Sequence, residues 1–178
     1  MVVELIKWLL QTLTLLAQAG VAIALFHIIF YRKGFFYEAY RENKDKLLWM
    51  AFAVALVATL GSLFYSEIVG WSPCKLCWYQ RILMYPLVLI LWIAAMRRDN
   101  KIGVYVLPMT VIGAVIAAFH YLQQVSVTFA QLSKGCAADG VDCSVRYTFS
   151  YGYITIPMMA LTAFIIIGLL AYLKRKER

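Results

Sequence analysis

Residues 47–66 read LLWMAFAVALVATLGSLFYS, a stretch of 20 residues without a single charged side chain. A helix needs about 20 predominantly apolar residues to cross the roughly 30 Å hydrocarbon core of a bilayer. Working outward from this stretch, four others are uncharged or nearly so. They are residues 8–31, 76–96 (interrupted only by Arg81), 102–133 and 147–173. The sequence therefore predicts an all-α membrane protein with five transmembrane helices.

The last two stretches are longer than one span requires. Polar residues at 123–126 and a turn-forming segment at 151–153 predict helices near 102–125 and 154–173. With 63% hydrophobic and only 15% charged residues, the composition excludes a soluble domain, which averages about a quarter charged residues. It also excludes intrinsic disorder, which needs low hydrophobicity and high charge.

Lysine and arginine collect in three connections. Residues 32–46, 97–101 and 174–178 carry 12 of the 17 basic residues, and +7 of the net charge of +8 after their acidic residues are subtracted. These connections alternate correctly with five spans, so the positive-inside rule predicts that they and the C-terminus are cytoplasmic. The connections around 67–76 and 126–153 are then extracytoplasmic. The basic excess therefore indicates topology, and no nucleic-acid partner is predicted.

The first span has an alternative interpretation as a signal peptide, because Ala17-Gln18-Ala19 resembles a small-residue cleavage site. The stretch stays hydrophobic well beyond that site, and Glu4 accompanies Lys7 where a signal peptide has a basic segment. We therefore expect residues 1–46 to form an uncleaved N-terminal transmembrane helix and its cytoplasmic connection. We expect residues 47–178 to form a domain of four transmembrane helices.

All four cysteines fall in the two connections predicted to be extracytoplasmic: Cys74, Cys77, Cys136 and Cys143. Thiols confined to the oxidising side of a membrane indicate disulfide chemistry. Cys74 and Cys77 form a Cys-x-x-Cys motif at a predicted helix start, where unpaired N–H groups and the helix dipole stabilise a thiolate. This position favours a redox-active first pair, with two structural disulfides that pin the loops as the alternative.

A four-thiolate zinc site is a second alternative. Six residues separate Cys136 from Cys143, whereas zinc sites usually have two to four. Covalent haem is disfavoured because Trp78 follows Cys77, where a Cys-x-x-Cys-His motif requires histidine. We therefore predict no metal. Two dithiol pairs on one side of a membrane suggest a relay, and a lipid-soluble quinone is an electron acceptor that needs only an apolar slot with a few polar anchors.

Three residues near the cysteines are candidates for quinone binding. Arg81 lies one helical turn beyond Cys77, and we expect its charge to stabilise a quinone oxygen or the Cys77 thiolate; snorkelling to lipid headgroups is the alternative. Trp78 offers an aromatic wall. His120, towards the outer end of its span, could donate a proton or hydrogen bond to the quinone. A hydrogen bond between helices is the equally open alternative for His120.

The sequence PCKLCWYQR at residues 73–81, followed by Tyr85-Pro86 in the same predicted helix, resembles the signature of the disulfide bond formation protein B family. This family includes the DsbB and BdbC proteins. Further matches extend the resemblance over roughly residues 47–173, at Cys136, Cys143-Ser144 and Pro157.

The resemblance implies a four-helix transmembrane bundle in the bacterial plasma membrane, here with one additional N-terminal transmembrane helix to which the sequence assigns no role. It implies an oxidoreductase that reoxidises a thioredoxin-like thiol:disulfide oxidase of the DsbA or BdbD type. Electrons would pass to ubiquinone or menaquinone.

By the same resemblance, Cys136 forms the mixed disulfide with the partner and Cys74 exchanges with the second pair. Cys77 then faces the quinone, with Arg81 as the anchor. Two other functions stay open. A quinone reductase like vitamin K epoxide reductase would carry its Cys-x-x-Cys after the loop cysteines, and here the motif precedes them. A non-enzymatic membrane protein would use its disulfides only to brace its loops.

Overall fold

The computed structural model describes residues 1–30, 46–99, 101–132 and 141–175. Within these residues no β-strand forms, and the only bridge joins Ser150 to Ile154. Five helices are long and apolar enough to cross a membrane. They are α1 (Val2–Phe30), α3 (Lys46–Leu63, continued by the π-helical turn η1, Phe64–Ile68), α4 (Lys75–Arg97), α5 (Gly103–Val125) and α7 (Ile156–Arg175), and a short α6 (Val127–Leu132) follows α5. The prediction of an all-α membrane protein with five apolar helices is confirmed.

Most helix boundaries lie close to their predicted places. The exception is α1, which begins at Val2, well before the predicted residue 8. Helix α4 starts after Cys74, whose extended backbone (φ −73°, ψ 173°) makes it the N-cap residue. It ends at Arg98, whose left-handed conformation turns its N–H back to the carbonyls of Ala94 and Ala95. Because Cys74 is the N-cap residue, the Cys-x-x-Cys motif lies at the start of α4.

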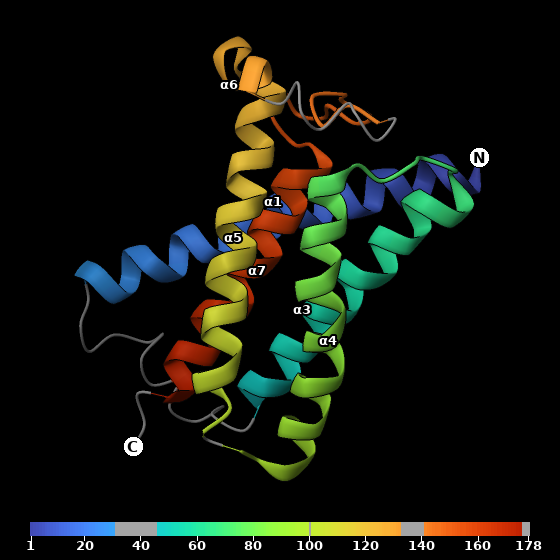
Figure 1. Cartoon of the computed structure of the whole chain (residues 1–178). Helices are drawn as coiled ribbons and strands as arrows, with labels where there is room; N and C mark the ends of the chain where they lie inside the picture. Colours follow the sequence, from blue (N-terminus) through green and yellow to red (C-terminus); the bar gives the residue numbers. More distant parts are fainter. Residues whose placement is uncertain (31–45, 100, 133–140, 176–178) are drawn as a thin grey trace.

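Helices α3, α4, α5 and α7 run side by side and form the core (Figure 1). Leu48, Leu87, Leu91 and Ile167 are buried between them. A small residue allows α5 and α7 to approach closely, because a Cβ atom at Gly113 would overlap the ring of Phe164. Small residues at helix contacts are the usual means of close packing in membrane proteins.

Helix α1 crosses these four helices obliquely (Figure 1). Only 6% of its most apolar part is buried, against 33% for each of the other four long helices. It packs against α7, so it is an addition to the outside of a four-helix core.

The start of α4, the end of α5 and the segment before α7 lie at one end of the bundle, opposite the C-terminus (Figure 1). This end brings together four of the predicted site residues, namely Cys74, Cys77, His120 and Cys143 of the predicted second pair. The fold therefore assembles the candidate site from three separate segments of the chain.

Candidate redox site

Cys74 and Cys77 are a dithiol pair at the first turn of α4. The Cys74 thiol donates a hydrogen bond to the sulfur of Cys77, with 3.3 Å between the two Sγ atoms. Cys74 is buried, and Cys77 is partly buried one turn further along. Cys77 lies in the first turn of α4, where backbone N–H groups have no partner within the helix and a thiolate is stabilised.

The hydrogen bond between the two thiols gives them different roles. It is the main cause that raises the pKa of Cys74 to about 12, and burial acts in the same direction. The contact with His120 works against both. In the reduced state Cys74 therefore keeps its proton at neutral pH and supports negative charge on Cys77.

His120 is 2% exposed and links the elements of the site. The side-chain nitrogen of Gln80 donates to His120 Nδ1 at 2.9 Å and to the carbonyl of Leu76 at 3.2 Å. Because the amide nitrogen must face that carbonyl, Nδ1 is an acceptor and the proton of the neutral ring lies on Nε2. Nε2 is 3.2 Å from the Cys143 carbonyl oxygen and 3.6 Å from Cys74 Sγ. The predicted hydrogen bond between helices is thus present, and the other ring nitrogen faces the cysteines.

Cys143 lies beside the first pair. It is 1% exposed, and it shares a small cleft with Cys74, Cys77 and His120. The second cysteine pair therefore reaches the first through Cys143. Cys136 lies outside the described residues, so its pairing with Cys143 and its role towards a partner stay predictions.

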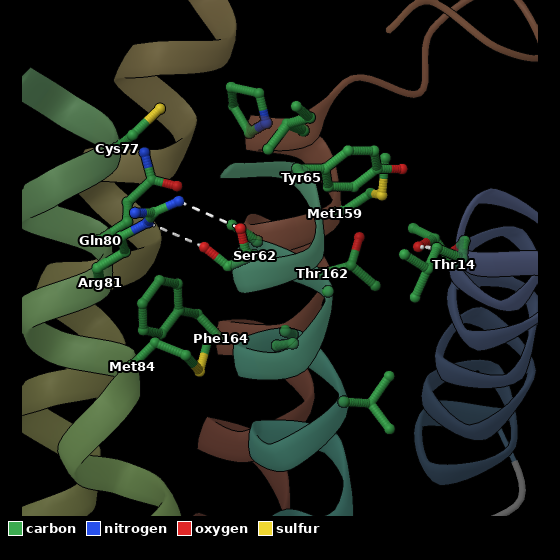
Figure 2. Close-up of a pocket in the computed structure, with 18 of the residues that line it drawn as sticks. Thr14, Ser62, Tyr65, Cys77, Gln80, Arg81, Met84, Met159, Thr162 and Phe164 are labelled. Atoms are coloured by element: carbon green, nitrogen blue, oxygen red, sulfur yellow. Dashed lines mark hydrogen bonds between the residues drawn. The ribbon is translucent and has the colours of Figure 1, made fainter. Parts of the chain in front are cut away.

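A larger cavity of about 380 Å³ opens on the other side of Cys77, between α1, α3, α4 and α7. Cys77, Gln80 and Arg81 point into it from α4 (Figure 2). Arg81 donates from Nε to Ser62 Oγ at 3.0 Å and from Nη2 to the Ser62 carbonyl at 3.1 Å. Two hydrogen bonds thus hold the guanidinium against α3, at the edge of the cavity.

Three aromatic rings that the sequence analysis missed also line this cavity. Trp71 stacks between Tyr65 and Tyr147, with ring centroids 5.3 Å and 5.1 Å away and interplanar angles of 3° and 15°. Nζ of Lys7 in α1 lies 4.8 Å from the centre of the Trp71 ring. The only sequence signal was that Trp71 lies within the predicted 67–76 connection and Tyr65 just before it; the third ring comes from a distant segment.

Trp78 does not join this cavity. It is 52% exposed, and the Arg81 guanidinium carbon lies 5.3 Å from its ring centre. Successive helical residues point about 100° apart, so the residue after Cys77 faces outward. The proposed aromatic wall is therefore built by the Tyr65–Trp71–Tyr147 stack, while Trp78 covers the outer side of Arg81.

A soft metal ion could be held by three atoms of the site. The ligand atoms of Cys74, Cys77 and His120 all lie within 4.8 Å of one another. Zinc is commonly bound by such thiolate and imidazole ligands. Closing a disulfide between the two cysteines would remove two of the three ligands, so metal binding and redox cycling exclude each other here.

Comparison with known proteins places this site in a family. Residues 44–174 match the family described as disulfide bond formation protein DsbB. The chain is 50% identical over 137 residues to disulfide bond formation protein C of Bacillus subtilis strain 168, which is 77% of this chain and 98% of that relative. No solved structure matches significantly.

Two further relatives carry similar names. The probable disulfide formation protein C 1 of Bacillus anthracis is 42% identical over 139 residues, which are 78% of this chain and 99% of that protein. The probable disulfide formation protein of Coxiella burnetii is 38% identical over 129 residues, which are 72% and 87% of the two chains. Helix α1 lies outside the family match, which begins at residue 44.

Proposed function

Since this chain belongs to the DsbB family of disulfide bond formation proteins, we propose that it is a membrane protein-dithiol:quinone oxidoreductase. Its donor is a reduced thioredoxin-like thiol oxidase outside the cytoplasm, and its acceptor is ubiquinone or menaquinone. The site residues fit such an acceptor, because an apolar cavity of about 380 Å³ has a thiol and an arginine at one end. Ligand pockets typically enclose about 300–1,000 Å³ and combine apolar walls with few polar groups.

The first step exchanges a disulfide with the partner. A thiolate of the reduced partner attacks Cys136 of a Cys136–Cys143 disulfide and releases Cys143 as a thiolate. The partner's second thiol displaces Cys136, so the partner leaves oxidised and the second pair becomes a dithiol. Such exchange requires a thiolate, access to the attacked sulfur and a good leaving group.

The second step moves the electrons to the first pair. The Cys143 thiolate attacks Cys74 of a Cys74–Cys77 disulfide and expels Cys77, and Cys136 then attacks Cys143 and releases Cys74. The Nε2–H of His120 points towards Cys74 Sγ and stabilises the charge that develops on this leaving group.

The third step is carried out by Cys77 and Arg81. The quinone in the cavity takes up two electrons as the Cys77 thiolate and the Cys74 thiol form the S–S bond again. One proton of the quinol comes from the Cys74 thiol and the other from water. Arg81 offsets the negative charge on the acceptor oxygen. Two electrons and two protons leave with the quinol, and all four cysteines return to the oxidised form.

One observation carries this proposal: Cys77 lines both hollows of the site. It borders the small cleft with Cys74 and Cys143, and it borders the large cavity with Arg81. Of these two hollows, Cys74 borders the small cleft and does not border the large cavity. This position supports the proposal that Cys77 receives electrons on one side and releases them on the other.

The proposed orientation puts this end of the bundle outside the cytoplasm of a bacterial cell and the C-terminus inside. Its support is the charge distribution, since 12 of the 17 basic residues lie in the three connections assigned to the cytoplasmic side. The cysteines then face the compartment in which disulfides form.

The proposal is tested in membranes that contain this protein, a reduced thioredoxin-like substrate and added quinone, with oxygen excluded. Quinol formation and substrate thiols are both measured. We expect Cys77→Ala to abolish quinol formation, while Ile82→Ala, an exposed change on the outside of the same helix, leaves it unchanged. Quinol formation that persists in Cys77→Ala would refute the assigned exit.

The structural-disulfide alternative makes a different prediction. Disulfides that only brace loops stay oxidised when quinone is depleted, whereas relay cysteines become reduced as the partner delivers electrons. Thiol labelling of quinone-depleted membranes separates the two, and metal analysis of the purified protein tests the zinc alternative.

A further inference from the structure

Helix α1 is fixed to the bundle by specific polar contacts. The Gln18 side chain donates to Thr162 Oγ1 of α7 at 2.8 Å and accepts from the Tyr153 hydroxyl at 2.6 Å. One and a half turns earlier, Thr12 Oγ1 lies 2.9 Å from the Tyr151 hydroxyl. Hydrogen bonds between polar side chains help to hold transmembrane helices together, so these contacts fix the position of α1 on the bundle.

The inner face of α1 forms a wall of the large cavity. Leu10, Thr14 and Ala17 line it and recur at the three- and four-residue spacing of a single helix face. The helix also approaches α3, because a Cβ atom at Gly61 would be in ordinary van der Waals contact with both methyl groups of Leu10, at 3.5 Å. The outward Leu16 is 64% exposed. Only one face of α1 therefore serves the cavity.

The cavity has two chemically different ends. Cys77 and Arg81 point in from α4 at one end, while Thr14 of α1 lies at the far side, beyond Ser62 and Thr162 (Figure 2). Between them, apart from Ser62 and Thr162, the walls are mostly apolar side chains of α3 and α7. A ring that reacts at Cys77 and Arg81 therefore has an apolar path that leads towards α1.

We propose that α1 supplies the binding wall for the prenyl tail of the quinone. This inference rests on the proposed quinone acceptor. The ring lies at Cys77 and Arg81, and the tail runs between α3 and α7 across Leu10, Thr14 and Ala17. Because α1 lies outside the family match at residues 44–174, it adds a tail contact that the matched region does not itself contain.

The test compares a quinone that carries two isoprene units with the same ring that carries no tail, in both the benzoquinone and naphthoquinone series. We expect Ala17→Trp and Thr14→Trp, which fill the α1 side of the cavity, to raise the KM for the prenylated quinone roughly tenfold. A tenfold increase corresponds to the loss of the contact that about two CH₂ groups of the tail make with the cavity wall. The KM for the tail-less ring stays unchanged, which also shows that each variant folds. The matched control is Leu16→Trp. It introduces the same residue on the outer face of α1, and we expect it to leave both KM values unchanged.

A second measurement does not depend on turnover. A prenylated quinone with a photoreactive group at its tail end labels peptides of α1, and Thr14→Trp reduces that labelling. Equal effects of Ala17→Trp on both quinones, no effect on either, or labelling confined to α4 and α5 would overturn this inference and leave the proposed function intact. Failure of the unmodified protein to reduce any quinone would overturn both.

Discussion

Replacing His120 separates a role in disulfide exchange from a role in binding the acceptor. His120→Leu removes both hydrogen-bonding nitrogens, whereas His120→Gln restores an amide donor that can reach the position of Nε2. Both variants lose the ring at a site that is 2% exposed. They therefore share the loss of packing and differ in the donor that faces Cys74 and the Cys143 carbonyl.

The magnitude follows from the contacts of Nε2, which lies 3.6 Å from Cys74 Sγ and 3.2 Å from the Cys143 carbonyl oxygen. A hydrogen bond to a charged group contributes about 1.5–3 kcal/mol. If it stabilises the Cys74 thiolate as it leaves, its loss slows exchange about 10- to 150-fold. We expect this slowing in His120→Leu and a rate within about fivefold of the original in His120→Gln.

The assay is a rapid-quench experiment in which the oxidised protein meets a reduced partner without quinone. Alkylation followed by mass spectrometry gives the rate at which Cys74 becomes a thiol, and steady-state turnover gives the KM for quinone. An exchange rate in His120→Leu within twofold of the original would refute the reasoning. A raised KM with unchanged exchange would instead return His120 to the predicted role of a donor to the quinone.

Three further outcomes are expected. Arg81→Met should raise the KM for quinone about 10- to 100-fold through loss of a charge-assisted hydrogen bond, with a smaller rise in Arg81→Lys; an unchanged KM in steady-state assays would exclude Arg81 as the anchor. Alkylation of Cys74 in the reduced protein should stay slow through neutral pH, because its pKa is raised to about 12 mainly by the hydrogen bond to Cys77. In Cys77→Ala, alkylation of Cys74 should begin at a lower pH, because the hydrogen bond that raises its pKa is lost. A shift to higher pH, or no shift, would contradict this cause of the raised pKa. Gly113→Ala, which forces a Cβ atom into the facing ring of α7, should lower the free energy of unfolding by about 1–3 kcal/mol; Gly20→Ala, with open space around it, is the control, and equal melting temperatures would show that the α5–α7 contact yields easily.

The helices could be predicted from sequence because the bilayer imposes a length and a composition on each of them. Residues 76–96 were predicted to form one span despite Arg81, and α4 covers Lys75–Arg97. The position of Arg81 on the same cavity wall as Cys77 was also predictable, since residues four apart share a helix face. Both inferences use only local periodicity.

Contacts between distant segments were not predictable in this way. Ser62, which holds Arg81, and Tyr147, which completes the aromatic stack, come from other elements and carry no motif. Trp78 looked suitable by composition, yet its angular position on α4 turns it outward. The sequence periodicity of one helix does not determine which of its faces contacts another helix.

The sequence by itself determined the five apolar helices, the membrane class of the protein and the placement of every cysteine outside the predicted helix interiors. These follow from hydrophobicity and charge, which act residue by residue. The tertiary structure alone decided that Cys77 borders two hollows, that His120 joins Gln80 to Cys143, and that α1 forms one wall of the large cavity. Those features depend on how side chains from separate helices fill shared space, and packing of that kind exists only once the helices have met.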